Sequence, residues 1–199
     1  MAVGASQPRL DRLVSSSVAK PIRITVGDTV HVSGLLQNPA HARACYVLAH
    51  GSGAGMNHPF MTAVAAELAL RGIGTLRYQF PYMERGAKRP DPPRLAQATV
   101  RAAVGAALCL LPETPLIAGG KSFGGRMTSQ AQEKAPLQGV CGLAFLGFPL
   151  HPAGRPSRSA PRICSTFRSR CCSCKVPAMH WRRPINLSRF AKNSAGLQR

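Results

Sequence analysis

The sequence predicts an α/β protein whose mostly parallel sheet carries helices on both faces. Three observations support this fold class. Short apolar runs alternate with segments of helical spacing, two of these runs end in glycine-rich turns, and a hairpin pattern precedes them all. With 199 residues, 45% of them hydrophobic, the chain is long enough for one domain with one sizeable core.

The expected elements follow in chain order. Residues 20–36 alternate β-branched and polar side chains around the turn-prone Gly27-Asp28, which predicts two antiparallel strands. Strands are expected at 45–49, 73–80, 115–118 and 140–148, and helices at 60–70, 95–111 and 126–134. Right-handed crossovers place the turns that follow parallel strands at one sheet edge. The turns HGSGAG (residues 50–55) and GGKSFGG (residues 119–125) should therefore form one site.

The turn GGKSFGG admits two chemical interpretations. A phosphate-binding loop of the form G-x-x-x-x-G-K-[ST] needs a glycine five residues before Gly120. That position is Pro115, which has no N–H to donate and a fixed φ. The sequence therefore disfavours a phosphate loop.

A nucleophile elbow, G-x-S-x-G, fits the same turn better. Gly120 and Gly124 are the small residues that let a tight strand-to-helix turn close around Ser122. The backbone N–H of Phe123 and that of Ser52, in HGSGAG, are the candidate oxyanion-hole donors. A merely structural glycine-rich turn is the alternative.

Four segments resemble a known family: HGSGAGMNHPFM, GIGTLRYQFPYMERGAKRPDPP, AGGKSFGGRMTSQAQ and GLAFLGFPLHPAG. They look like bacterial, dienelactone-hydrolase-like relatives of the testis-expressed and NSL-complex-subunit hydrolase-like proteins. The resemblance runs from about residue 20 to about Ser157. It implies an α/β-hydrolase fold in which Ser122 is the nucleophile for an ester-type acyl bond of a small-molecule substrate, with no cofactor.

The chain departs from this family in the residues that should assist the serine, an acid and a histidine. In such hydrolases the acid and then the histidine follow the serine in the chain. After Ser122 there are only Glu133, His151 and His180, and no convincing last strands follow residue 152. We expect the usual acid to be missing, the sheet to lack its last strands and the activity to be impaired or lost.

Three histidines are candidates for a substitute base. His151 is the main candidate, and His50 and His58 are further ones, although local hydrogen bonding is the commoner role for loop histidines. The alternative function is a non-catalytic interaction scaffold.

The composition divides the chain into an N-terminal extension (1–19), an incomplete hydrolase core (20–157) and a basic, cysteine-rich tail (158–199). The tail holds 10 of the 26 Lys and Arg residues and four of the seven cysteines, and no acidic residue follows Glu133. It has three interpretations: a zinc site, a nucleic-acid-binding arm, or translation out of frame. The zinc ligands would be Cys164, Cys171, Cys174 and His180.

The out-of-frame interpretation has support in the genetic code. Synonymous codons for Arg168 to Arg183, read from the third base of the first codon, can encode VPMLFLQGTRDALAE. That sequence is a strand followed by a turn with an aspartate, as the resemblance would require. We therefore predict a frame change near Ser157 and no metal site, with nucleic acid as a partner only if the tail is genuine.

Two further expectations concern the setting of the protein. The N-terminus shows no secretion signal and no run is long enough to span a bilayer, so a cytoplasmic location without membrane contact and with reduced thiols is expected. The basic segment 83–94, MERGAKRPDPPR, is either a solvated loop or a recognition loop for an acidic substrate or partner.

Overall fold

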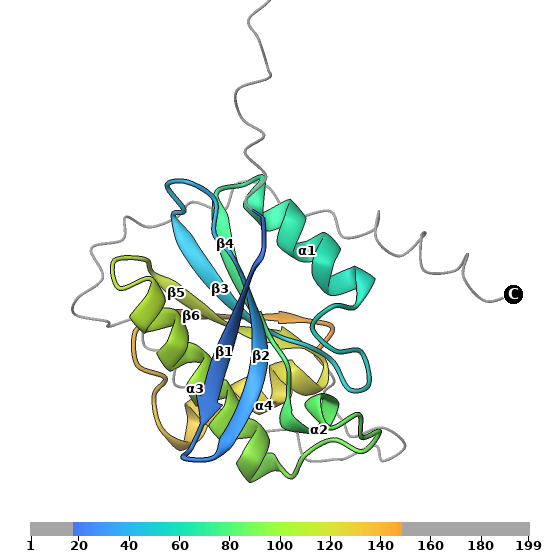
Figure 1. The fold of residues 1–199 in the computed structure, drawn as a ribbon. Helices are drawn as coiled ribbons and strands as arrows, with labels where there is room; N and C mark the ends of the chain where they lie inside the picture. The colour runs from blue at the N-terminus through green and yellow to red at the C-terminus, as the bar shows by residue number, and fades with distance from the viewer. Residues whose placement is uncertain (1–17, 149–199) are drawn as a thin grey trace, which may run out of the picture. The chain divides into compact units, whose positions relative to one another are not determined.

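The computed structural model describes residues 18–148 of the chain (Figure 1). Within them lie ten elements: β1 (Lys20–Val26), β2 (Val30–Gln37), β3 (Ala44–Ala49), α1 (Pro59–Ala69), β4 (Ile73–Tyr78), α2 (Pro81–Glu84), α3 (Pro93–Leu110), β5 (Leu116–Lys121), α4 (Phe123–Lys134) and β6 (Val140–Leu146). The expected N-terminal extension lies outside the described residues up to residue 17. His151, His180 and the whole tail 158–199 also lie outside them.

The six strands form one sheet in the order β1-β2-β4-β3-β5-β6. β1 and β2 pair antiparallel around the turn at Gly27-Asp28, and β2 pairs antiparallel with β4. The other neighbours, β4 with β3, β3 with β5 and β5 with β6, are parallel. The predicted hairpin and the predicted mostly parallel sheet are both confirmed.

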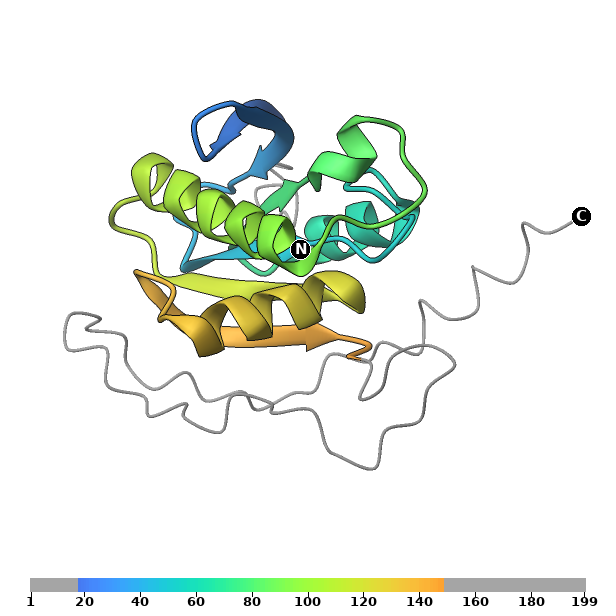
Figure 2. The same cartoon turned by 90° about the horizontal axis from the view of Figure 1, so that it is seen from below.

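Alternate residues of the central strand β3 pack on opposite faces of the sheet, as the pleat of a strand requires. Cys45, Val47 and Ala49 belong to the main core with buried residues of α3 and α4. Tyr46 and Leu48 belong to a smaller core with Met61 and Val64 of α1. Helices therefore cover both faces, α3 and α4 on one and α1 on the other (Figures 1 and 2).

Two elements differ from the sequence-based expectation, and both differences fall at the carboxyl ends of strands. α4 begins at Phe123, three residues before the expected start at residue 126, because the chain turns directly from β5 into the helix at Ser122. The short helix α2 was not expected. It begins at Pro81, and proline favours the first helical position because its missing N–H would have no partner there.

None of the helices within residues 18–148 is long and apolar enough to cross a membrane.

Candidate active site

Ser122 lies at the tight turn between β5 and α4 and has a strained backbone. Its φ is +48° and its ψ is −107°, a backbone conformation that residues other than glycine rarely adopt. Serine is a favoured N-cap residue, yet its side chain makes no capping hydrogen bond to α4. The hydroxyl is therefore not used to cap the helix, and Ser122 is only partly buried.

The two glycines that flank Ser122 are sites of close backbone approach. A Cβ atom at Gly120 would lie 2.7 Å from the Ala49 Cβ, and one at Gly124 would lie 2.6 Å from the same atom. Real Cβ atoms do not come this close, so only glycine fits at either position without movement of β3. The predicted role of Gly120 and Gly124 in closing the turn agrees with this packing.

The glycine-rich loop that follows β3, residues 50–55, lies beside this turn. Ala49 and Gly120 are register partners in the parallel pair of β3 and β5, so the two strands end side by side. A Cβ atom at Gly51 would lie 3.7 Å from the Lys121 carbonyl oxygen. The structure therefore brings together the two turns that were expected to share a site.

Both candidate oxyanion donors belong to these two turns. Phe123 is the first residue of α4, a position whose N–H has no partner within the helix. Ser52 lies in a turn closed by a bond from the Ala54 N–H to the Gly51 carbonyl oxygen, 3.3 Å long. Gly53 has a φ of +71° in this turn, which glycine adopts at no steric cost.

Residues 77–82, which run from β4 into α2, hold the glycine-rich loop along its length. The Phe80 N–H donates to Nε2 of His50 over 3.1 Å. Oε1 of Gln79 accepts from the Met56 N–H at 2.8 Å. The Tyr82 hydroxyl accepts from the Gly53 N–H at 3.0 Å.

His50 is a fully buried member of this arrangement. Because its Nε2 accepts from Phe80, its Nδ1 carries the proton and donates to the Gly51 carbonyl oxygen at 2.7 Å. Burial lowers the pKa of His50 below its ordinary value, and the bond to Gly51 offsets part of that effect. Both ring nitrogens are thus occupied by backbone groups, which leaves His50 unsuited to act as the base.

His58 also has a local structural role, because its Nδ1 accepts from the Phe60 N–H at 3.2 Å and so caps α1. Among residues 18–148, no histidine forms a hydrogen bond with Ser122. His151, the main candidate for a substitute base, lies outside the described residues. Glu133 is exposed on α4.

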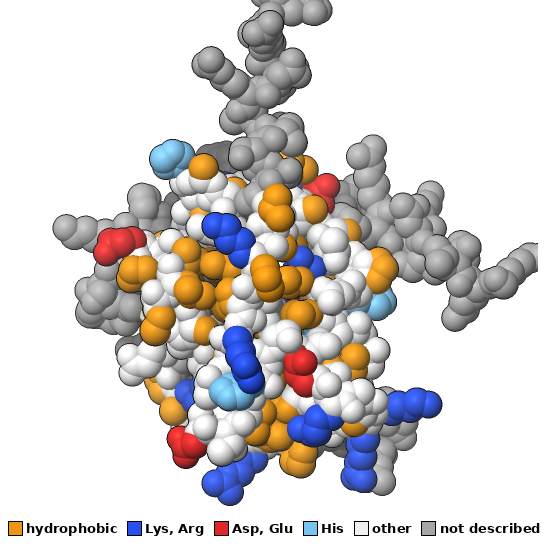
Figure 3. All heavy atoms as spheres, viewed as in Figure 1, with side chains coloured by type: hydrophobic (Ala, Val, Ile, Leu, Met, Phe, Trp, Pro, Cys, Tyr) orange, Lys and Arg blue, Asp and Glu red, His pale blue; other side chains and the backbone are white. Residues whose placement is uncertain are grey.

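Two of the charged residues considered in the sequence, Lys121 and Arg85, have local partners. Nζ of Lys121 lies 4.3 Å from the centre of the Phe60 ring, a cation–π contact. In the segment 85–94, Arg85, Lys88, Arg89 and Arg94 are exposed, and Figure 3 shows Lys and Arg side chains gathered near the lower edge of the face viewed there. Arg85 is paired with the buried carboxylate of Asp91 at 2.8 Å.

Sequence reasoning missed two aromatic residues, Phe80 and Tyr82, whose rings pack against residues of the two turns. The ring of Phe80 stands edge-on to His50 at 5.0 Å and to Phe123 at 5.3 Å, and the ring of Tyr82 stands edge-on to Phe123 at 6.4 Å. The sequence signal that could have indicated them is Pro81 directly after the strand, because proline favours the first position of a helix.

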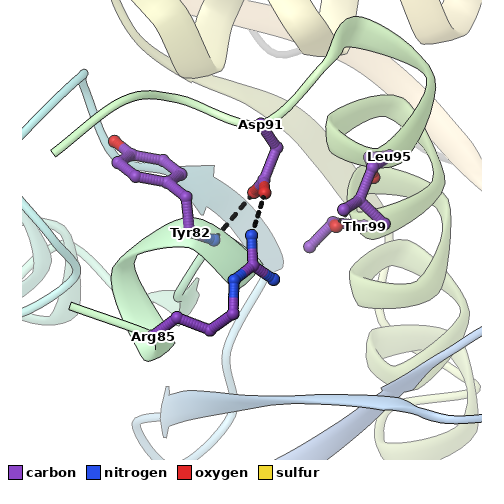
Figure 4. Close-up of polar contacts among 5 residues, drawn as sticks. All are labelled: Tyr82, Arg85, Asp91, Leu95 and Thr99. Atoms are coloured by element: carbon purple, nitrogen blue, oxygen red, sulfur yellow. Dashed lines mark hydrogen bonds and ion pairs between the residues drawn. The ribbon is translucent and has the colours of Figure 1, made fainter. Parts of the chain in front are cut away.

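Asp91 was missed as well. Its carboxylate accepts from the backbone N–H of Tyr82 at 2.9 Å and from Arg85, and it thereby fixes the start of α2 (Figure 4). A lone aspartate between prolines gives no sequence signal for this role.

No group of three or more metal-ligating side chains occurs in the described part of the chain. The candidate zinc ligands Cys164, Cys171, Cys174 and His180 lie outside it.

An α/β sheet with a serine on a strained strand-to-helix turn, next to a glycine-rich loop from the neighbouring strand, defines the class of α/β-hydrolase-fold proteins. The family comparison agrees. The family model described as "Alpha/beta hydrolase domain" matches residues 42–175 of the 199. The chain therefore belongs to the α/β-hydrolase domain family.

Three solved structures illustrate the similarity of fold. A dienelactone hydrolase from Anabaena variabilis is 22% identical with a TM-score of 0.56, and the match covers 64% of this chain and 62% of that one. A lidless α/β serine hydrolase from Xanthomonas campestris is 21% identical with a TM-score of 0.57 and coverages of 71% and 65%. An α/β serine hydrolase homologue from Coxiella burnetii is 18% identical with a TM-score of 0.52 and coverages of 66% and 63%.

At these identities the likeness concerns the fold. The chain spans 62–65% of the length of these three relatives. No curated protein matches the chain.

Proposed function

We propose that the chain is a serine hydrolase acting on an ester-type acyl bond of a small-molecule substrate, with Ser122 as its nucleophile and with an activity that the expected loss of the usual acid and histidine impairs. We propose the cytoplasm as its location. The observation that carries the proposal is the backbone of Ser122, held at a φ of +48° between β5 and α4 while its hydroxyl caps nothing in the helix. Strain of this kind costs about 1–3 kcal/mol and persists where the surrounding structure enforces it, most often at functional sites. Membership of the α/β-hydrolase family supports the same role for this turn.

The proposed chemistry has two steps. Oγ of Ser122 attacks the acyl carbonyl carbon while a base takes the hydroxyl proton, and the base gives that proton to the departing alcohol as the ester C–O bond breaks. Water then attacks the acyl-enzyme, one of its protons passes through the base to Oγ of Ser122, and the acid is released. The Phe123 and Ser52 N–H groups would stabilise the oxyanion of each tetrahedral intermediate, and the positive end of the α4 dipole would add to that effect.

A fluorophosphonate probe, which reacts only with activated serine nucleophiles, tests this proposal. We expect the full-length protein to be labelled slowly, because the usual acid is expected to be missing, and the labelling to disappear in Ser122→Ala. Ser33→Ala is the matched control, because Ser33 is an exposed residue of β2 whose backbone N–H, and not its hydroxyl, bonds to Glu84. Labelling that persists in Ser122→Ala would contradict the assignment of the nucleophile.

A second candidate function is a non-catalytic interaction scaffold. One observation favours it: His50 and His58, the two described histidines weighed as a base, have their hydrogen bonds with backbone groups. Absence of labelling in a folded, monodisperse sample would support the scaffold over the hydrolase.

If residues 158–199 are translated in the correct frame, we propose nucleic acid as their partner. This segment contains 10 Lys and Arg residues and no acidic residue. Retention on DNA should then fall steeply with salt and disappear when residues 158–199 are deleted. The gene gives a separate test of the tail: a second frame after the Ser157 codon that encodes a strand and an aspartate-bearing turn would support the frame change.

A further inference from the structure

The hydroxyl of Tyr82 reaches the glycine-rich loop from α2. It accepts the Gly53 N–H at 3.0 Å, a contact between residues 29 apart in the chain. The Tyr82 side chain that makes this contact is fully buried, although Ser52 and Gly53 are exposed.

The loop needs such an anchor because of its composition. Three of its six residues, Gly51, Gly53 and Gly55, are glycines, which lose more conformational freedom on ordering than any other residue. Within the loop itself the described bonds are the 3.3 Å backbone contact from the Ala54 N–H to the Gly51 carbonyl oxygen and the bond from Nδ1 of His50 to the same oxygen. A backbone donor contributes fully to oxyanion stabilisation only when it is already in place before the reaction. The candidate oxyanion donor in this loop is the Ser52 N–H. The hydroxyl of Tyr82 holds the next residue, Gly53, by accepting its N–H.

The same side chain contacts the other half of the candidate oxyanion hole. The Tyr82 ring stands edge-on to the ring of Phe123, with 6.4 Å between the centres and an angle of 85° between the planes. Tyr82 thus joins the residue beside one donor, Ser52, to the residue that carries the other, Phe123.

The backbone of Tyr82 is itself held by Asp91. Its backbone N–H donates to Oδ2 of Asp91 at 2.9 Å, and Oδ1 of the same carboxylate accepts from Arg85 at 2.8 Å (Figure 4). Asp91 is buried and precedes α3, whose residues Leu95 and Thr99 are drawn to its right in the same view. The start of α2, which carries Tyr82, is therefore held by Asp91 and not by the loop that Tyr82 anchors.

We propose that Tyr82 is a positioning residue of the hydrolytic site, which holds the Ser52 N–H in register with the Phe123 N–H through its bond to the Gly53 backbone. This inference rests on the proposed function of Ser122. It assigns to Tyr82 no contact with the reacting atoms.

Tyr82→Phe tests the proposal, because it removes the hydroxyl and keeps the ring that packs on Phe123. With the fluorophosphonate probe on the full-length protein, we expect the maximal labelling rate to fall about tenfold or more, while the half-saturating probe concentration stays unchanged. If Tyr82 were needed only for folding, Tyr82→Phe would lower the unfolding midpoint but would not lower the maximal labelling rate of the folded protein. The amide of Gly53 should also exchange with solvent faster in Tyr82→Phe.

Tyr78→Phe is the matched control. Tyr78 is another fully buried tyrosine, in β4, and its hydroxyl has no hydrogen-bond partner in the described structure. We expect its labelling rate and the exchange at Gly53 to equal those of the unmodified protein.

Each outcome separates the two proposals. If the unmodified protein is labelled and Tyr82→Phe is labelled at the same rate, the positioning role is wrong while the hydrolase stands. If exchange at Gly53 is unchanged in Tyr82→Phe, the anchoring bond is absent in solution and the positioning role is again wrong. If the unmodified protein is not labelled at all, the hydrolase proposal fails, and the role of Tyr82 in it fails too.

Discussion

The backbone of Gly124 packs directly against His50, the first residue of the glycine-rich loop. A Cβ atom at Gly124 would lie 2.5 Å from the His50 carbonyl oxygen. The helix that starts at the Ser122 turn and the loop that follows β3 are therefore in backbone contact. This contact fixes the spacing between the two turns that form the candidate site.

Gly124→Ala should destabilise the protein, because the added methyl group must displace the backbone of β3 or α4. We expect a loss of about 1–3 kcal/mol, the usual cost of overpacking. Gly105→Ala is the control, since Gly105 lies within α3 and a Cβ atom there would meet nothing within 4 Å. Alanine at that position should raise stability by roughly 0.5–1 kcal/mol through its helix propensity. Urea unfolding measures both, and equal midpoints for the two variants would contradict the packing described for Gly124.

Ser122→Gly should be more stable than Ser122→Ala. Both variants lose the hydroxyl, but only glycine adopts a φ of +48° without strain. We expect a difference of about 1 kcal/mol, at the low end of the cost of such strain, because glycine also gains entropy in the unfolded chain. Thermal unfolding of the two variants side by side measures it, and a higher midpoint for the alanine variant would show that the turn is relaxed in solution.

The stability of the protein should fall as the pH is lowered through the ordinary pKa of histidine. Burial lowers the pKa of His50 below 6.5, so the unfolded chain takes up a proton at that pH while the folded chain does not. The stabilisation is fully present above that pH and is lost toward the lower pKa of the folded state, at up to about 1.4 kcal/mol per pH unit.

His50→Gln removes the titrating group and should flatten this dependence. The measurement is the urea midpoint of both proteins between pH 7.5 and about pH 5. Among the histidines of residues 18–148, His50 is the buried one. An equally steep dependence in the variant would mean that other groups cause it.

Asp91→Ala should cost more than Arg85→Ala, although the two side chains form one ion pair. Asp91 is buried, and its removal leaves the Tyr82 N–H without its acceptor, which costs about 1–3 kcal/mol. Arg85 is 57% exposed, so its loss should cost about 0–1 kcal/mol. Chemical unfolding of the two variants separates the effects, and equal losses would place the stabilisation in the ion pair rather than in the backbone bond.

Most of the fold was predictable from local pattern. The apolar run of β3, the hairpin around Gly27-Asp28 and the alanine-rich helix α3 all lie where periodicity and turn residues placed them. The start of α4 at Phe123 was missed because Gly124 and Gly125 are poor helix formers by propensity, and only the contact with β3 makes glycine necessary there. The helix α2 was missed because four residues carry too little periodicity to be recognised.

The candidate site likewise has a part that could be predicted from the sequence and a part that could not. Ser122, Gly120 and Gly124 form a local motif whose spacing alone indicates a strand-to-helix turn. The pairing of His50 with Phe80, and of Tyr82 with Gly53, joins residues about 30 positions apart, and no local pattern encodes such a contact.

By itself, the sequence determined the order of strands and helices, the class of fold and the turn on which Ser122 lies, because each depends on residues adjacent in the chain. Tertiary structure alone decided that His50 is a buried structural residue and not a base, and that Tyr82 and Asp91 support the glycine-rich loop. Those roles depend on which backbone groups face each side chain across the sheet edge. That is settled when β3, β4 and β5 pair in parallel and bring their carboxyl ends together.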